Sequence, residues 1–453
     1  MDKATYEAPQ PTRLKLEEGS RVAVMGGGQA GSFFSYFLLS MAERIGLNIH
    51  VDIYEPRDSA APGPAGCNMC GGIVSESLVQ HLAAEGILLP PTVVQRGIDS
   101  YILHTDQGLV RIGLPQDEKR IAAVFRGSGP RGLSERKWDS FDGHLQSLAT
   151  RQGAQVIRAR VERANWRAGR VEIKSNNGVQ VYDLLAVATG INTAAHRLFE
   201  KLEIPYRSPR TTKTIIREYY LGEDAVAHHL GSSMHVFLLN LPHMEFAALV
   251  PKGDYATVIM LGDDLDEHLL NAFMNLPEVR HVMPADVNPE QGSCQCQPRI
   301  AIRGAVQPYG DRIVFIGDCG VTRLYKDGIG AAYRAAKAAA TTAIFEGIST
   351  EDFRRHYWPV CRAMEVDNAI GKFIFFVTRL IQRLSFARRA IIRMTLHEQR
   401  PHGKGRRMSG ILWDTFTGSA AYRDIFLRAL NPAFLLRFGW DIAMSLWPVK
   451  SPP

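Results

Sequence analysis

Short, continuous apolar runs alternate with helically spaced segments in the first part of the chain. The run Arg21-Val-Ala-Val-Met25 would place apolar side chains on both faces of a strand, which predicts a buried parallel strand. A glycine-rich turn follows, then a helix from about Ser32 to Ile45 and a second strand from Ile49 to Glu55. This order of strand, helix and strand indicates a βαβ unit.

The same buried-strand pattern returns later in the chain. Asp183 to Gly190 and Arg312 to Asp318 are apolar runs with glycine near their ends, and an alanine-rich helix from Ile329 to Glu346 follows the second. Alternating positions from Ser100 to Val124, before these runs, and from Tyr206 to Leu261, between them, predict antiparallel strands.

These patterns predict an α/β fold in which a Rossmann-like domain is interrupted by a domain with an antiparallel sheet. From about Thr350 onward the apolar spacing is helical, which adds a helical C-terminal region. We expect the Rossmann-like domain to comprise residues 20–98, 136–200 and 300–349, the antiparallel-sheet domain residues 99–135 and 201–299, and the helical region residues 350–453.

The turn after the first predicted strand carries a dinucleotide-binding pattern. Gly26-Gly27-Gly28-Gln29-Ala30-Gly31 matches G-x-G-x-x-G, whose glycines permit a tight turn, close approach of a pyrophosphate and packing of the helix on the sheet. Glu55 ends the next predicted strand, 24 residues after Gly31, where its carboxylate would accept hydrogen bonds from a ribose diol. The pattern predicts a dinucleotide site that includes Gly26, Gly28, Gln29, Ala30, Gly31 and Glu55.

Two further segments resemble the glutathione-reductase-type FAD fold. Gly317-Asp318 at a strand end, followed by Asp327-Gly328-Ile329-Gly330 at a helix start, resembles its C-terminal flavin fingerprint, and Ala188-Thr189-Gly190 resembles its middle fingerprint. In that family the aspartate binds the ribitol chain and the helix N-terminus faces the pyrimidine ring, where the helix dipole stabilises negative charge on reduction. The resemblance implies FAD as the cofactor, with further contacts at Gly190, Gly317, Asp318, Gly328, Ile329 and Gly330.

The chain also resembles one branch of this fold, the branch with a single dinucleotide motif, because no second G-x-G-x-x-G lies near its middle. Cys70-Gly71-Gly72-Ile73 resembles the segment that geranylgeranyl reductases place beside the flavin, which implies that Gly71 and Gly72 contact the cofactor. Phe141-Asp142-x-x-Leu145, leading to Gly153-Ala154, resembles a helix of the same family. Val250-Pro251-Lys252-Gly253 resembles part of its substrate motif, although Ala248 stands where that motif has tryptophan.

The resemblance to geranylgeranyl reductases implies that reduced FAD transfers a hydride to a carbon–carbon double bond of an apolar, isoprenoid-like substrate. Because a second nucleotide motif is missing, the electron donor is expected to be either NAD(P)H, bound transiently, or a ferredoxin-like protein. One alternative is a flavin-dependent hydroxylase of an aromatic or quinone-precursor substrate. Another is an electron-transfer flavoprotein that passes electrons through a cysteine-bound iron–sulfur centre to a quinone. Cys70, Tyr325 and Lys326 are candidate catalytic residues near the predicted flavin site, and ordinary structural roles are the alternative for Tyr325 and Lys326.

Four of the six cysteines fall in two pairs, Cys67-x-x-Cys70 and Cys294-x-Cys296. Together these pairs could supply four thiolates to one zinc ion or iron–sulfur centre. A redox-active dithiol at Cys67 and Cys70 is a second interpretation, and packing of small side chains is a third. Cys319 and Cys361 are isolated and are interpreted as packing residues.

Charge is distributed unevenly along the chain, whose formal net charge is +7. Residues Ile370 to Pro453 contain 14 Lys and Arg against 4 Asp and Glu, a net charge of +10, which leaves −3 for the rest. On a helix drawn from Ile370 to Leu396, basic residues gather within a third of the circumference and Phe, Leu and Ile occupy most of the rest. The basic residues of this face are Lys372, Arg379, Arg383, Arg389 and Arg393, with Arg388 as an exception on the apolar side.

A basic amphipathic helix of this kind is typical of a segment that lies in a membrane interface. The alternative is a helix packed on the protein body with a solvated basic face. We expect contact with an anionic membrane through residues 370–447, an apolar small-molecule substrate and no nucleic-acid partner. No signal peptide or transmembrane helix is expected, which predicts a cytoplasmic protein that lies peripherally at the inner face of a membrane.

Overall fold

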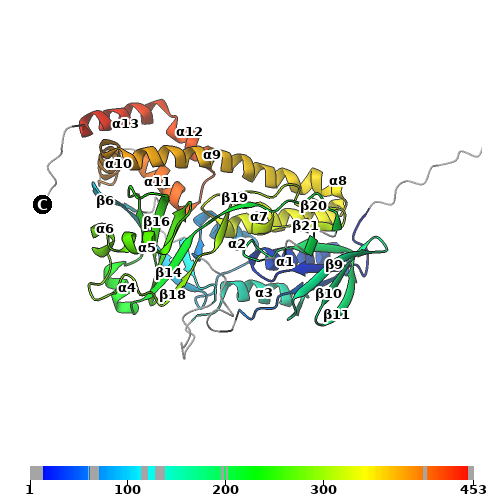
Figure 1. Cartoon of the computed structure of the whole chain (residues 1–453). Helices are drawn as coiled ribbons and strands as arrows, with labels where there is room; N and C mark the ends of the chain where they lie inside the picture. Colours follow the sequence, from blue (N-terminus) through cyan, green and yellow to red (C-terminus); the bar gives the residue numbers. More distant parts are fainter. Residues whose placement is uncertain are drawn as a thin grey trace, which may run out of the picture.

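The apolar runs predicted as buried strands lie side by side in one sheet (Figure 1). The computed structural model describes residues 14–59, 61, 71–113, 121–127, 138–193, 195, 198–199, 202–400 and 406–446. The order in this sheet is β20 (Tyr309–Gly310), β21 (Ile313–Phe315), β12 (Leu184–Val187), β1 (Arg21–Met25), β2 (His50–Tyr54) and β8 (Gln155–Ile157). All neighbours pair in parallel except β20, which is antiparallel to β21. The predicted α/β fold is confirmed.

Both faces of the parallel sheet are covered, which explains the continuous apolar composition of its strands. Val22 and Val24 of β1 pack toward α1 (Gln29–Arg44) and α7 (Gly328–Thr341), where Phe33 and Tyr333 meet edge to face at 5.6 Å. The alanines of α7 allow this helix to lie close to α1. Residues 23 and 25 of β1 face an antiparallel meander of β9 (Val161–Arg167), β10 (Arg170–Ser175) and β11 (Gly178–Tyr182).

A second large sheet supplies the inserted domain predicted from the alternating segments. Its order is β18 (Cys294–Cys296), β14 (Ile215–Tyr220), β17 (Tyr255–Gly262), β16 (Met244–Lys252), β15 (Ser233–Phe237), β5 (Ser100–Thr105) and β6 (Gly108–Gly113). The sheet is antiparallel, as predicted, except that β5 and β15 pair in parallel. Alternation of apolar and polar residues shows which face of a strand is buried, but it does not show whether the strand pairs in parallel or antiparallel with its neighbour. The proposed domain boundaries themselves stay a prediction.

Smaller elements connect the two sheets. β7 (Ile121–Val124) pairs with β3 (Ile73–Val74) and β4 (Val94–Ile98) rather than with the large antiparallel sheet, and β13 (Arg210–Lys213) pairs with β19 (Arg299–Arg303). The helices in these regions are α2 (Glu76–Ala84), α3 (Phe141–Arg151), α4 (Glu223–His229), α5 (Glu267–Met274) and α6 (Pro277–Arg280). Ser75 and Ser140 cap the N-termini of α2 and α3 by accepting hydrogen bonds from Leu78 N and Gly143 N.

The described C-terminal residues are helical, as predicted, and lie along one edge of the molecule (Figure 1). A π-helical turn (Phe353–Tyr357) joins α8 (Thr350–Asp352) to the long helix α9 (Trp358–Arg383). Trp358 packs on Tyr309 of the parallel sheet, whereas Gln382 donates a hydrogen bond to the Glu245 carbonyl of the antiparallel sheet at 2.6 Å. α9 therefore spans both sheets. α10 (Ser385–Glu398), α11 (Arg407–Thr417), α12 (Tyr422–Ala429) and α13 (Pro432–Ser445) complete the region.

The single helix expected from Ile370 to Leu396 is wrong, because the chain leaves the helical conformation at Leu384. Arg388 explains the break. Its guanidinium lies buried, donates to the Ile381 and Gln382 carbonyls in the last turn of α9, and pairs with Asp106 at 2.8 Å. Arg388, the exception in the helical projection, thus satisfies carbonyls that the end of a helix leaves unpaired.

Two buried histidines in the antiparallel sheet predict a specific acid sensitivity. His104 Nε2 and His235 Nδ1 are 2.9 Å apart, and both residues are 3% exposed. Burial lowers the pKa of His104 to about 3 and that of His235 to about 4, from an ordinary value of 6.5. Below pH 6.5 the unfolded chain binds protons that the folded chain does not, so stability should fall from pH 6.5 toward pH 4, by about 2 kcal/mol per histidine at pH 5.

The measurement is the urea unfolding midpoint at pH 7 and at pH 5. His104→Asn should show a smaller loss of midpoint between these pH values than the unsubstituted protein, because one buried titrating group is removed. His228→Asn, at an exposed histidine on α4, is the matched control and should leave the pH dependence unchanged. An unchanged pH dependence in His104→Asn would contradict the assignment.

Candidate functional site

The predicted glycine turn joins β1 to α1 through very close backbone contacts. Gly26 has a φ of +109°, and a β-carbon there would lie 2.4 Å from the Ala188 carbonyl oxygen at the end of β12. A β-carbon on Gly31 would lie only 1.9 Å from the Gly26 carbonyl oxygen. Both distances are shorter than any real contact of a β-carbon, so these positions require glycine. The α1 N-terminus is thereby held against the end of the sheet.

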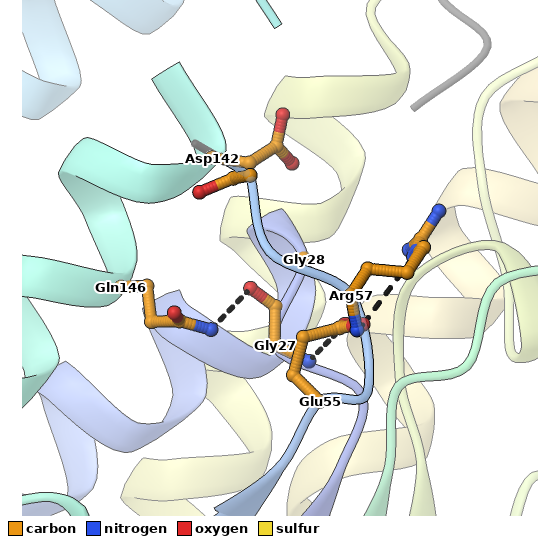
Figure 2. A pocket seen from close by; sticks show the side chains of 7 residues that line it. Gly27, Gly28, Glu55, Arg57, Asp142 and Gln146 are labelled. Atoms are coloured by element: carbon orange, nitrogen blue, oxygen red, sulfur yellow. Dashed lines mark hydrogen bonds and ion pairs between the residues drawn. The ribbon is translucent and has the colours of Figure 1, made fainter. Parts of the chain in front are cut away.

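Glu55 closes the turn from the side of β2 (Figure 2). Its Oε2 accepts a hydrogen bond from Gly27 N at 2.9 Å, and its Oε1 accepts one from Arg57 N at 3.0 Å. The side chain is buried, so these charge-assisted bonds fix the carboxylate at the strand end. A carboxylate can accept about four hydrogen bonds, which leaves capacity for hydroxyl groups of a ligand.

A small, open pocket lies over the turn. Its lining comes from the glycine turn, the residues after β2 and the first turns of α3: Gly27, Gly28, Glu55, Arg57, Ser59, Asp142 and Gln146. Gln146 Nε2 donates to the Gly27 carbonyl at 3.4 Å, on the side of the turn away from Glu55 (Figure 2). The pocket therefore combines exposed backbone at a helix N-terminus with a carboxylate and an arginine, a combination suited to a nucleotide.

A buried ion pair that the sequence reasoning missed lies beside the glycine turn. Arg126, just after β7, donates to both carboxylate oxygens of Asp142, at 2.8 and 3.0 Å. The Gln29 side-chain oxygen, oriented toward the same guanidinium, accepts at 2.7 Å. Asp142 belongs to the Phe141-Asp142-x-x-Leu145 segment, which could have marked it, whereas no local pattern singles out Arg126.

Asp318 lies at the end of β21, close to the glycine turn. Gly317 has a φ of +68°, and a β-carbon there would lie 2.7 Å from the Ala30 β-carbon, so this strand end packs directly on α1. The Asp318 side chain is exposed, yet the protein around it desolvates the carboxyl and raises its pKa against the opposing effects of Thr322 and Arg126.

The ends of β21, β12 and β1 are adjacent in the sheet order, so the three predicted fingerprints meet at one edge. The Ile316 amide donates to the Val187 carbonyl at 2.9 Å, next to Gly190, whose φ is +67°. In open α/β sheets, ligands bind outside the carboxyl ends of the strands. The structure thus brings the Gly26–Gly31 turn, Glu55, Gly190 and Asp318 to the position where such a ligand would lie.

The loop from Gly320 to Asp327 carries the chain from Asp318 to α7 and is held by the C-terminal helices. Asn368 of α9 accepts a hydrogen bond from Leu324 N and donates one to the Thr322 carbonyl, both at 2.8 Å. Tyr422 of α12 donates to the Leu324 carbonyl at 2.5 Å. The loop contains two residues with positive φ, Tyr325 and Asp327, a conformation that costs free energy in residues other than glycine.

A buried charge network completes this anchoring. The Asp327 carboxylate pairs with Arg323 at 3.1 Å and with Arg334 at 2.8 Å, and Arg323 also approaches Asp367 of α9 at 3.4 Å. Asp327 lies over the start of α7, where a β-carbon on Gly330 would be 2.2 Å from its Oδ1. This network therefore fixes the predicted helix start, where Gly328 is exposed and Ile329 is buried.

Lys326 and Tyr325, two of the candidate catalytic residues, both contact the C-terminal region. Lys326 Nζ donates to the Asp414 carbonyl at 3.0 Å and lies 3.9 Å from the centre of the Tyr422 ring. Burial lowers its pKa to about 7, whereas burial raises the pKa of Tyr325, whose ring packs edge-on against Phe375. These contacts give both residues a structural role, and their catalytic role stays a prediction.

The structure describes four of the six cysteines. Cys67 and Cys70 lie outside the described residues, so a shared four-cysteine centre stays a prediction. Cys294 and Cys296 are half-buried on β18 and point to the same face of that strand because they are two residues apart. Within the described part of the chain, no three His, Cys, Asp or Glu side chains are grouped so that they could hold a metal ion. Cys319 and Cys361 are buried.

The two segments that resemble geranylgeranyl reductases meet between the sheets. A β-carbon on Gly72 would lie 2.5 Å from the Val124 carbonyl oxygen and 3.4 Å from Lys252 Nζ, and one on Gly71 would lie 2.7 Å from Ile259 Cδ1. Lys252 is buried at the end of β16, 3.7 Å from Glu218 Oε1. The Gly71-Gly72 and Val250-Pro251-Lys252-Gly253 segments, far apart in sequence, are thus in contact.

Comparison with solved structures shows the fold. The chain is similar to a geranylgeranyl bacteriochlorophyll reductase-like protein from Thermoplasma acidophilum, with 14% identity and a TM-score of 0.63 over 91% of this chain and 99% of that one. It is similar to p-nitrophenol 4-monooxygenase from Pseudomonas putida, with 15% identity and a TM-score of 0.55 over 90% and 100% of the two chains. A mutant of the halogenase PltM in complex with FAD matches with 12% identity and a TM-score of 0.58 over 95% and 91%.

No protein-family model matches the sequence. No curated protein is similar to it in sequence. The chain shares the fold of the reductase-like protein, the monooxygenase and the FAD-bound halogenase, and this agreement confirms the predicted fold class.

The close contacts of the glycine turn predict that two of its glycines differ in how much they contribute to stability. Gly31→Ala should lower the free energy of unfolding by about 3 kcal/mol, because the new methyl group would overlap the Gly26 carbonyl. Gly28→Ala is the matched control, because Gly28 has a φ of −72° and its β-carbon would approach nothing closer than 3.8 Å. Urea unfolding should leave this variant within about 1 kcal/mol of the unsubstituted protein, because Gly28 is the N-cap of α1 and alanine caps a helix less well than glycine. Equal stability of the two variants would contradict this account.

Proposed function

We propose that the protein is an FAD-dependent oxidoreductase that reduces a carbon–carbon double bond of an apolar, isoprenoid-like substrate. The residues at the sheet edge fit FAD in their chemistry. Glu55 offers a buried carboxylate for the adenosine ribose, the Gly26–Gly31 turn offers backbone and a helix N-terminus for the pyrophosphate, and Asp318 offers a carboxylate for the ribitol. Known proteins of this fold include one solved with FAD.

The contact of Gly72 with Lys252 is the observation that favours a double-bond reductase over a hydroxylase or an electron-transfer protein. These residues belong to the two segments that resemble geranylgeranyl reductases, and the packing of one on the other is independent support for that resemblance. Gly71 also packs on Ile259 of the antiparallel sheet. The segment beside the proposed flavin is thus continuous with apolar side chains of the sheet, a setting that suits an isoprenoid chain.

The residues of the chain then have separable tasks. When bound, reduced FAD supplies a hydride to one alkene carbon while a proton reaches the other, so that the double bond is saturated and FAD is left oxidised. The buried contacts of the Gly320–Asp327 loop hold the N-terminus of α7 in place, where the helix dipole would stabilise negative charge on a reduced flavin ring. NAD(P)H is proposed as a transient donor of the two electrons, and Cys70, Tyr325 and Lys326 remain the candidate proton donors.

Replacing Glu55 tests the cofactor site. Glu55→Ala should raise the Kd for FAD at least 100-fold, because the ribose contacts and the buried acceptor for Gly27 N are both lost, each a charge-assisted hydrogen bond of about 1.5–3 kcal/mol. Glu55→Gln keeps an acceptor for Gly27 N and should bind FAD with an intermediate Kd. Titration of the apoprotein, followed by flavin fluorescence, provides the measurement.

Glu172→Ala on β10 is the control for removing a carboxylate away from the site. FAD should bind this variant as tightly as it binds the unsubstituted protein. Tight binding of FAD to Glu55→Ala would contradict the proposed site, and failure of the unsubstituted protein to take up FAD would contradict the whole proposal.

Anaerobic turnover tests the reaction itself. FAD-loaded protein, reduced with dithionite, should be reoxidised by geranylgeranyl diphosphate in the absence of oxygen, and mass spectrometry should show a product that has gained two hydrogens per saturated bond. Reoxidation that requires oxygen, with an oxygenated product from an aromatic substrate, would instead establish a hydroxylase. Rapid reoxidation by a quinone in protein that contains iron would establish electron transfer. Either of these results would contradict the reductase assignment.

A further inference from the structure

Large apolar side chains exposed to solvent are concentrated in the C-terminal helices. Among the described residues, 14 of the 22 large hydrophobic side chains that are exposed lie between Val366 and Leu446, although this segment is less than a fifth of the chain. Single exposed apolar residues are ordinary on a protein surface, but a cluster of this size marks a surface that contacts another apolar phase or partner.

On α9 the exposed apolar residues form one stripe. Phe373, Phe376, Val377, Leu380 and Leu384 follow the helical spacing and are each more than a third exposed. The opposite side of the helix, with Gly371 and Phe375, is buried against the protein, where Gly371 packs on the Tyr422 ring. The helix is therefore apolar on both its inner and its outer side.

α13 repeats this arrangement at the outer edge of the molecule. Leu436 and Trp440 are 77% and 60% exposed, and Leu435, Met444 and Leu446 extend the same outward side. The two charged residues of this helix are Arg437 and Asp441, which pair with each other at 3.0 Å, and the Asp441 carboxylate is buried against α10 with Arg393. The outward side of α13 carries no acidic residue.

α12 joins the two exposed stripes into one surface. Phe426 of α12 contacts Phe373 of α9 with ring centres 5.8 Å apart, and Leu427 and Leu430 are half-exposed beside them. Figure 1 shows α9, α12 and α13 along the same edge of the molecule. We name the exposed apolar residues of α9, α12 and α13 described above the C-terminal apolar surface.

Positive charge surrounds the C-terminal apolar surface. Lys372, Arg383, Arg423 and Arg428 are exposed on α9 and α12, and residues 370–453 carry a net charge of +10. Of the four acidic residues in that segment, Glu398 and Asp441 are buried, Asp414 pairs with Arg428 at 2.6 Å, and Asp424 of α12 is exposed. An apolar surface bordered by Lys and Arg, with a tryptophan at its edge, matches the interface of an anionic lipid bilayer.

We propose that the C-terminal apolar surface docks on an anionic lipid bilayer. A second copy of the chain is the other partner with a matching apolar face, but pairing two identical surfaces would bring two strongly positive segments together. Among the described residues, no helix combines the length and apolar composition that crossing a bilayer requires, and α13 has only 14 residues. The helices would therefore lie in the interface, parallel to the membrane.

This docking would place lipid next to the proposed catalytic region. α9 presents Phe373, Phe376 and Val377 outward, while Asn368 and Phe375 of the same helix contact the loop from Gly320 to Asp327. A substrate dissolved in the bilayer would thus be available on the side of the protein that holds this loop. This step rests on the proposed function, whereas the docking itself rests only on the surface.

Vesicle flotation tests the docking with the full-length protein. The unsubstituted protein should float with vesicles of phosphatidylglycerol and phosphatidylcholine, and binding should weaken with salt and on pure phosphatidylcholine. The double variant Leu436→Glu and Trp440→Glu should lower the bound fraction at least tenfold, and Phe376→Glu with Leu380→Glu should do the same on α9. Leu88→Glu is the matched control, since Leu88 is 72% exposed but lies outside the surface.

Circular dichroism should show unchanged helix content for all these variants, because every substituted side chain is exposed. Failure of the unsubstituted protein to float with either kind of vesicle would overturn the proposal. So would equal flotation of the α13 double variant and the unsubstituted protein. A dimer in sedimentation that the α13 variant converts to a monomer, without any vesicle binding, would assign the surface to a second copy instead. None of these outcomes depends on FAD binding or catalysis.

Discussion

Backbone packed directly on backbone at the carboxyl end of the parallel sheet determines where every other part of the candidate site lies. The turn at Gly26 lies against the Ala188 carbonyl just after β12, Gly31 of α1 lies against the Gly26 carbonyl, and Gly317 just after β21 lies against Ala30. Each contact is possible only because a β-carbon is missing. Side chains at these positions would separate α1 from the strand ends, and the Glu55 carboxylate could no longer reach Gly27 N. The requirement for glycine is therefore a property of the fold itself, before any ligand is considered.

The opposite side of the site depends on the C-terminal helices. The loop from Gly320 to Asp327 adopts left-handed conformations at Tyr325 and Asp327, which isolated chain would rarely populate. Asn368 and Tyr422 satisfy its backbone groups from α9 and α12, and the ion pairs of Asp327 with Arg323 and Arg334 lie buried beneath them. Removing one partner of such a buried ion pair lowers the free energy of unfolding strongly, because the other charge is left buried and unpaired. Replacing the whole pair by apolar residues has a much smaller effect. The C-terminal region is thus a structural part of the site rather than an appendage, and it links the loop to the outer surface of α9.

The sequence was sufficient for features that depend on short-range pattern. The strand at Arg21–Met25, the glycine turn, the Glu55 position and the start of α7 at Gly328 all follow from local residue types and spacing. The features that it did not reveal depend on contacts between distant segments. The parallel pairing of β5 with β15 depends on chain path, and the break at Leu384 depends on Arg388 reaching Asp106, which lies 282 residues away. Arg126 was missed for the same reason, because its partners come from α1 and α3.

Several arginines of the C-terminal region form ion pairs with the rest of the protein, whereas the helical projection suggests a basic face exposed to solvent. Arg379 pairs with Glu245 and fastens α9, and Arg388 pairs with Asp106 and fastens α10. Arg393 pairs with Asp441 and joins α10 to α13. Because these arginines are used on the inner side, the outer side is left to Phe, Leu and Trp. Clustered exposed apolar side chains on adjoining helices mark a contact surface, and each would gain up to about 1.5–3 kcal/mol if a second apolar phase covered it. The exposed lysine and arginine residues beside them fix the sign of the charge that such a phase should carry.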